Sequence, residues 1–172
     1  MNDAKTETKR DNVNTECILV NILKKHHLTI TTAESCTGGL VASTLINVSG
    51  VSEVLKESYI TYADETKQKL LHVSKETLAK YTAVSKETAY EMVVGVTDIA
   101  AADVGISVTG IAGPDGGSGD FPVGLVYIGF KIKDSVTVER FVFNGDRMQV
   151  RMSAVDMALT RLTELLYEEG YR

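Results

Sequence analysis

The stretch LTITTAESCTGGLVASTLINVSG, residues 28–50, predicts the fold class. Its apolar start, LTITT, is typical of a buried strand, and the polar residues Glu34, Ser35, Cys36 and Thr37 follow it, with two glycines after them. The segment from Thr37 to Gly50 is rich in Gly, Ala, Ser and Thr, so we expect a helix that packs closely against a neighbour. A strand that turns directly into a helix is the repeating unit of α/β proteins.

The rest of the chain continues this alternation. Helices are expected over residues 15–27, 64–73, 73–81 and 84–101 and from Asp146 toward the C-terminus, and further strands over 56–63, 103–110, 123–132 and 136–143. The last two strands are separated by only a few residues, which predicts an antiparallel hairpin. The order predicts a three-layer α/β/α sandwich with a mixed, mainly parallel five-stranded sheet.

Five residues are candidates for helix N-caps because their side chains can accept a hydrogen bond from the first turn. They are Thr15, Asp64, Ser74, Ser85 and Asp146.

Length and composition narrow the class of protein. Residues 1–13 are polar and are expected to form a flexible tail, whereas residues 14–172 are expected to form one domain. The formal net charge of −5 makes direct binding to nucleic acid unexpected. Because no apolar run approaches the roughly 20 residues that span a membrane, we expect a cytoplasmic protein without a membrane segment.

The cysteines and histidines do not predict a metal site. Cys17 and Cys36 are the two cysteines, and we expect both to be free thiols. The three histidines, His26, His27 and His72, lack metal-ligand spacing. We therefore expect neither a metal nor a cofactor.

Two glycine-containing loops are candidates for the functional site. AESCTGG, residues 33–39, leaves one strand and enters a helix, and TGIAGPDGG, residues 109–117, leaves another strand and stays irregular. If the two strands are parallel, both loops lie at the same edge of the sheet, where ligands of α/β proteins bind. The second loop could surround a polar or phosphorylated ligand with backbone amides, or it could simply need tight turns.

Ser35 is the first candidate nucleophile. Backbone N–H groups near Ser35 to Thr37, at the expected start of the helix, could stabilise an oxyanion, although a glycine-lined turn that only packs tightly explains the same residues. Cys36 is the rival nucleophile, but a free cysteine is more often a small buried residue. The histidines are expected on the surface, so a buried, neutral lysine is the candidate base. Lys67 and Lys69 point to different helix faces, and Lys67 could turn toward the sheet edge, although most such lysines are solvated.

Two arginines near the start of the last helix could hold a phosphate. Arg147 and Arg151 lie one helical turn apart, and each guanidinium offers a fork of donors. Surface salt bridges are the alternative explanation for both.

The motifs together resemble the CinA C-terminal domain family. TTAESCTGGL, SYITYADETKQKLLHV, AVSKETAYEMVVG, ADVGISVTGIAGPDGGSGDFPVGLVYIGF and FNGDRMQVR occur in the family's order and spacing, from about residue 15 to the end. The chain is similar to stand-alone members without the N-terminal molybdopterin-binding-like domain of larger members. The resemblance implies an α/β/α sandwich and the activity of a nicotinamide-nucleotide amidase, which converts nicotinamide mononucleotide to nicotinate mononucleotide and ammonia.

The resemblance also implies roles for particular residues. The family's amidases are regarded as Ser/Lys hydrolases, which places the nucleophile on Ser35 and the base on Lys67, with Tyr62 orienting the lysine or sharing its proton. Thr109 stands where several relatives have serine, and Arg147 matches an arginine of the ligand site. The residues expected to contact the substrate are Cys36, Thr37, Gly38, Thr109, Gly110, Gly113, Arg147 and Arg151.

Two other functions stay open. One is a non-catalytic module that binds a nucleotide or a protein partner and is related to competence- and damage-inducible proteins. The other is an amidohydrolase acting on a different pyridine or small amide. A small-molecule nucleotide substrate and a homo-oligomer are the partners we expect.

Overall fold

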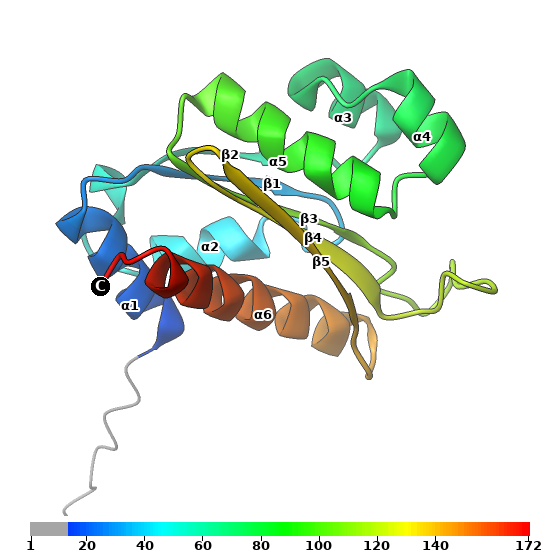
Figure 1. Cartoon of the computed structure of the whole chain (residues 1–172). Coiled ribbons are helices and arrows are strands. Elements are labelled where there is room, and N and C mark those ends of the chain that lie inside the picture. Colours follow the sequence, from blue (N-terminus) through cyan, green and yellow to red (C-terminus); the bar gives the residue numbers. More distant parts are fainter. Residues whose placement is uncertain (1–13) are drawn as a thin grey trace, which may run out of the picture.

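The computed structural model describes residues 14–172, so the predicted tail over residues 1–13 lies outside the described residues. Within that range the elements alternate as the sequence predicts (Figure 1). The α-helices are α1 (Thr15–Lys25), α2 (Leu40–Ile46), α3 (Asp64–Leu71), α4 (Lys75–Tyr81), α5 (Lys86–Ala100) and α6 (Arg147–Glu168), and a short 3₁₀ helix covers Val51–Glu53. The strands are β1 (Ile30–Glu34), β2 (Leu55–Ile60), β3 (Val104–Gly110), β4 (Leu125–Ile132) and β5 (Ser135–Val142).

The five strands form one mixed sheet in the order β2-β1-β3-β4-β5. β1 pairs in parallel with both β2 and β3, whereas β4 is antiparallel to β3 and to β5. Two of the four strand pairings are thus parallel and two are antiparallel. Four of the five strands nevertheless run in the same direction, because only β4 is reversed. The hairpin of β4 and β5 confirms the prediction, and Lys133 takes a positive φ of 51° at its turn.

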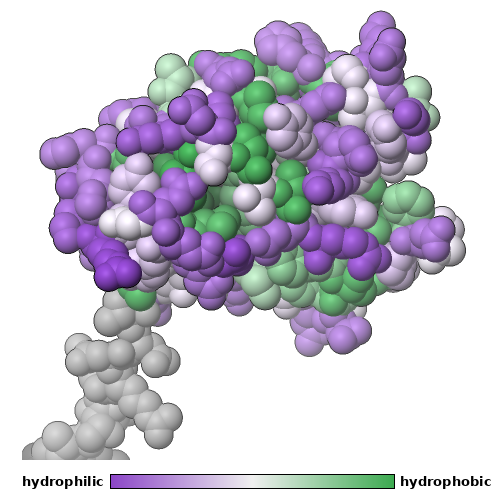
Figure 2. Space-filling view, viewed as in Figure 1, coloured by the Kyte–Doolittle hydropathy of each residue, from purple (hydrophilic) through white to green (hydrophobic). Residues whose placement is uncertain are grey.

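Helices cover both faces of the sheet, which confirms the three-layer α/β/α sandwich. α1, α2 and α6 lie on one face and α3, α4 and α5 on the other (Figure 1). The larger apolar core lies between the sheet and the α1–α2–α6 layer, and its α6 residues are Val150, Ala154, Val155, Ala158, Leu159, Leu162 and Leu166. In Figure 2 hydrophobic residues gather in a band between the two helix layers. No helix of residues 14–172 has the length and apolar character needed to cross a membrane.

Three of the five predicted N-caps are confirmed. The side chains of Ser74 and Ser85 accept from the amides at the third position of α4 and α5, and Asp146 forms a capping box at the start of α6. Thr15 and Asp64 were wrong as caps. Each is the first residue of its helix, after Asn14 and Ala63, and neither of those residues caps with its side chain.

The turn after β1 is longer than the sequence predicts. α2 begins at Leu40, so Ser35 lies five residues before the helix instead of directly in front of it. Gly38 and Gly39 adopt positive φ angles of 62° and 93°, a conformation that glycine reaches at little cost. Because β1 and β3 are parallel neighbours, the turn after β1 and the loop after β3 lie at the same edge of the sheet, as expected.

Candidate active site

The structure brings Ser35 and Lys67 together. Lys67 lies in α3, and its side chain is 1% exposed. Its Nζ is 3.4 Å from Ser35 Oγ and donates to the main-chain carbonyls of Thr61 at 3.0 Å and Tyr62 at 3.2 Å. The loop between β2 and α3 therefore supplies two acceptors, and the turn after β1 supplies the serine.

Burial lowers the pKa of Lys67 below that of an exposed lysine, because the ammonium loses its hydration. The carboxylate of Asp64, whose Oδ1 lies 3.7 Å from Nζ, opposes this shift. In the neutral form, two N–H groups can stay on the carbonyls of Thr61 and Tyr62 while the nitrogen lone pair faces the Ser35 hydroxyl. This arrangement suits proton transfer from the serine to the lysine.

A cavity of about 210 Å³ opens beside the two side chains. Its lining comes from five segments of the chain: Ser35, Cys36, Tyr62, Lys67, Ala83, Val84, Thr109, Gly110, Ala112 and Arg147. Five sequence-predicted site residues besides Ser35 and Lys67 line this cavity, namely Cys36, Tyr62, Thr109, Gly110 and Arg147, whereas Thr37, Gly38, Gly113 and Arg151 do not.

The phenol of Tyr62 forms no hydrogen bond with Lys67. Tyr62 meets the lysine through its carbonyl oxygen, while its hydroxyl accepts from Arg147 Nη2 at 3.1 Å. Arg147 Nη1 donates to the carbonyl of Gly113 at 2.8 Å. Arg147 thus joins the loop before α3 to the loop after β3 at the cavity. No hydrogen bond supports the prediction that the phenol of Tyr62 orients Lys67.

Thr109 fixes a wall of the cavity that sequence reasoning missed. Its Oγ1 donates to the carbonyl of Ala83 at 2.7 Å, and Ala83 and Val84 line the cavity from the segment between α4 and α5. The residue types of Ala83 and Val84 predict no chemistry, although both begin one of the family motifs, AVSKETAYEMVVG.

Arg151 lies behind the turn that carries Ser35 and does not line the cavity. Its Nε donates to the carbonyl of Cys36 at 3.0 Å, and its Nη2 donates to the carbonyl of Thr37 at 2.7 Å. The turn needs glycine at position 38 for its positive φ and not for space, because a Cβ there would lie 3.4 Å from Arg151 Nη2, an ordinary contact. The predicted contact of Arg151 with a substrate phosphate is therefore replaced by contacts with the protein backbone.

The sequence also did not predict a role in the site for Glu34. Its carboxylate is fully buried and accepts from the amides of Gly39, Val41 and Ala42 at 2.9, 3.1 and 2.9 Å. Those are the amides at the start of α2, which begins five residues after Ser35. The start of α2 is therefore not free to bind an oxyanion, and the amides near Ser35 to Thr37 that the sequence predicts as donors remain the candidates.

Cys36 is a poor nucleophile in this setting. It is 6% exposed, and burial raises the pKa of its thiol to about 11. The thiol is therefore protonated at neutral pH, whereas nucleophilic attack needs the thiolate. Among residues 14–172, no three His, Cys, Asp or Glu side chains lie close enough together to hold a metal ion.

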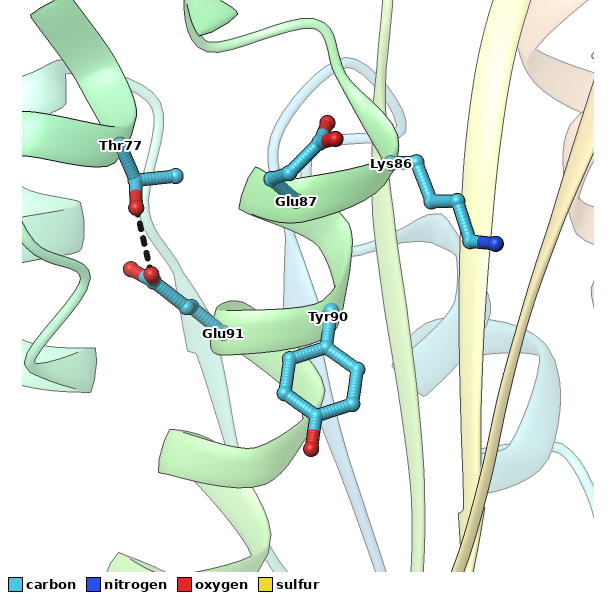
Figure 3. A pocket seen from close by; sticks show the side chains of 5 residues that line it. All are labelled: Thr77, Lys86, Glu87, Tyr90 and Glu91. Atoms are coloured by element: carbon cyan, nitrogen blue, oxygen red, sulfur yellow. Dashed lines mark hydrogen bonds between the residues drawn. The ribbon is translucent and has the colours of Figure 1, made fainter. Parts of the chain in front are cut away.

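A separate hollow of about 340 Å³ lies on the outer surface of α4 and α5 (Figure 3). Thr77, Lys86, Glu87, Tyr90 and Glu91 line it, and none of them is a predicted site residue. Glu91 is engaged within the protein, since it accepts from Thr77 Oγ1 and from the amide of Ser74. The hollow contains no nucleophile and base in contact.

Comparison with known proteins identifies the family. The family model described as the CinA C-terminal domain matches residues 12–166. The chain belongs to the CinA C-terminal domain family. A CinA-like protein of Kosmotoga olearia is 53% identical over 144 residues, which are 84% of this chain and 35% of that protein. The chain spans about a third of the length of the curated relatives it matches first.

Solved CinA superfamily structures share the fold. One from Escherichia coli is 38% identical, with a TM-score of 0.86 and coverage of 88% of each chain. One from Klebsiella pneumoniae is 34% identical, with a TM-score of 0.87 and coverage of 90% of this chain and 96% of that one. This chain therefore shares its fold with these CinA superfamily structures over the regions that overlap.

Proposed function

We propose that this CinA-family chain hydrolyses the carboxamide of nicotinamide mononucleotide, giving nicotinate mononucleotide and ammonia. One observation carries the proposal: a buried lysine lies 3.4 Å from a serine hydroxyl, and two main-chain carbonyls hold its other protons. A lysine that served only as a surface charge would be solvated. Burial of Lys67 beside Ser35 favours the neutral amine, which is the form that a base requires.

The first half of the reaction forms an acyl-enzyme. Ser35 Oγ attacks the carboxamide carbon while Lys67 Nζ takes the hydroxyl proton, and the carbonyl oxygen becomes an oxyanion. The C–N bond then breaks, and Lys67 gives the proton to the leaving nitrogen, which departs as ammonia. The nicotinoyl group remains on Ser35 as an ester.

The second half releases the product. Lys67, neutral again, takes a proton from a water molecule whose oxygen attacks the ester carbon. The bond between that carbon and Ser35 Oγ breaks, and the proton on Lys67 returns to the serine. The products are the nicotinate carboxyl group and the original pair of side chains.

The rest of the nucleotide extends toward Arg147 in this proposal. The carboxamide and pyridine ring occupy the cavity between Ser35 and the wall of Ala83 and Val84. Arg147 uses one donor on Gly113 and another on Tyr62, and a guanidinium has five N–H groups, so donors remain for the phosphate.

Ammonia release from three amides tests the proposal. Nicotinamide mononucleotide should have the highest kcat/KM, nicotinamide riboside should be slower through a raised KM because it lacks the phosphate, and nicotinamide should be slowest. Equal rates for all three would indicate a different amide as substrate. Nucleotide binding without any ammonia release would favour a non-catalytic module and would end the proposal.

A further inference from the structure

The proposed chemistry needs N–H donors for the oxyanion, and the start of α2 cannot supply them. Glu34 accepts from Gly39, Val41 and Ala42, so the first amides of that helix already have a buried anionic partner. The donors must therefore come from the turn itself.

Two amides of the turn lack an oxygen acceptor within the described residues. The amide of Ser35 donates to Val108 O and that of Gly38 donates to Ser35 O, which closes a four-residue turn. The amides of Cys36 and Thr37, at the centre of this turn, have no carbonyl or side-chain oxygen as acceptor in the described part of the chain. Both amides partly offset the rise that burial causes in the pKa of the Cys36 thiol, and Cys36 lines the cavity.

Arg151 sets the direction in which one of these amides points. The C=O and N–H of a trans peptide point in opposite directions, so holding the carbonyl of Cys36 toward α6 turns the N–H of Thr37 away from α6. The carbonyl of Thr37 also accepts from the amide of Leu40 at 3.4 Å. The carbonyl of Cys36, by contrast, accepts a hydrogen bond only from Arg151 among residues 14–172.

We propose that Arg151 is a positioning residue that orients the Cys36–Thr37 peptide, so that the Thr37 N–H donates to the oxyanion formed on the substrate. This inference rests on the proposed function. Arg151 acts from behind the turn and does not touch the substrate, which distinguishes it from Arg147 at the cavity. Arg147 and Arg151 lie one helical turn apart in sequence, but Arg147 lines the cavity and Arg151 binds the backbone of the turn.

Steady-state kinetics with two substrates tests the role. Arg151→Met should lower kcat about 10- to 100-fold, somewhat less than the loss of an entire oxyanion donor. The factor should be the same for nicotinamide mononucleotide and nicotinamide riboside, with little change in KM, because the phosphate is not involved. Arg151→Lys should recover part of kcat, because an ammonium can still reach one of the two carbonyls. Arg161→Met is the matched control, since Arg161 lies on the same helix but binds Glu139, Glu164 and Glu168, and it should keep kcat.

A loss confined to the phosphorylated substrate, with a raised KM, would overturn the proposal and make Arg151 a phosphate ligand. An unchanged kcat in Arg151→Met would overturn it as well. A crystal structure of Arg151→Met checks orientation without turnover: a rotated Cys36–Thr37 peptide supports the inference, and an unmoved peptide contradicts it. If the wild type releases no ammonia from any substrate, the proposed function fails, and the crystal structure still decides whether Arg151 orients this peptide.

Discussion

Replacing Lys67 with arginine separates a base from a mere positive charge. Arginine stays protonated at every accessible pH, so Lys67→Arg keeps the charge but cannot accept a proton from Ser35. Lys67→Met removes both properties and keeps a similar chain length. If Lys67 is the base, both variants should lose activity; if it only attracts phosphate, the arginine variant should keep most of it.

The size of the effect follows from the contacts of Lys67. General-base catalysis contributes about 10²- to 10⁴-fold, which corresponds to roughly 3–5 kcal/mol in the activation barrier. Because the side chain is 1% exposed and Nζ already has three neighbours within 3.4 Å, the larger guanidinium also crowds the site. Overpacking of that kind costs about 1–3 kcal/mol of folding free energy. We therefore expect a variant that is folded at 25 °C, melts earlier and is nearly inactive.

The assay is kcat/KM for nicotinamide mononucleotide between pH 6 and pH 10, with the folded fraction measured in parallel. In the wild type the rate should rise with pH through the lowered pKa of Lys67 and then level off, because the neutral amine is the active form. Lys69→Arg is the matched control, since Lys69 is exposed on the same helix and should tolerate the change. A Lys67→Arg variant with most of the wild-type rate and the same pH profile would refute the role of Lys67 as base.

Three further predictions concern residues around the site. Asp64→Asn should lower the pKa of Lys67 further and move the acidic limb of the kcat/KM profile to lower pH, because it removes the nearby carboxylate; a shift to higher pH would contradict this. Thr109→Val should raise KM and cost about 1–3 kcal/mol in denaturant unfolding, because the carbonyl of Ala83 loses its donor, and unchanged values of both would contradict it. Ser85→Ala removes the α5 cap and should cost about 0.5–2 kcal/mol of unfolding free energy without a change in kcat.

The fold could be predicted from local patterns. Alternating strand and helix signals gave the element order, the short connection gave the hairpin of β4 and β5, and Ser74 and Ser85 marked the starts of two helices. Thr15 and Asp64 failed as caps because each helix begins at the residue itself, and a cap must precede the first turn. That difference of one residue depends on backbone geometry and not on residue type.

The site could be predicted only in part. The residues of the turn and Lys67 came from motifs, and the structure places Ser35 and Lys67 in contact. The destination of a long side chain depends on tertiary packing, which is why the sequence did not reveal that Glu34 fills the start of α2. The same reason explains Arg151, whose guanidinium reaches backbone carbonyls 114 and 115 residues away in sequence.

The central claim is that Ser35 is the nucleophile of an amidase. The most direct test measures ammonia release from nicotinamide mononucleotide by the wild type, Ser35→Ala and Cys36→Ala, each shown to be folded. We expect Ser35→Ala to lose about 10³-fold or more in kcat, because no other group can form the ester, and Cys36→Ala to keep most of the wild-type rate. An active Ser35→Ala variant together with an inactive Cys36→Ala variant would contradict the account.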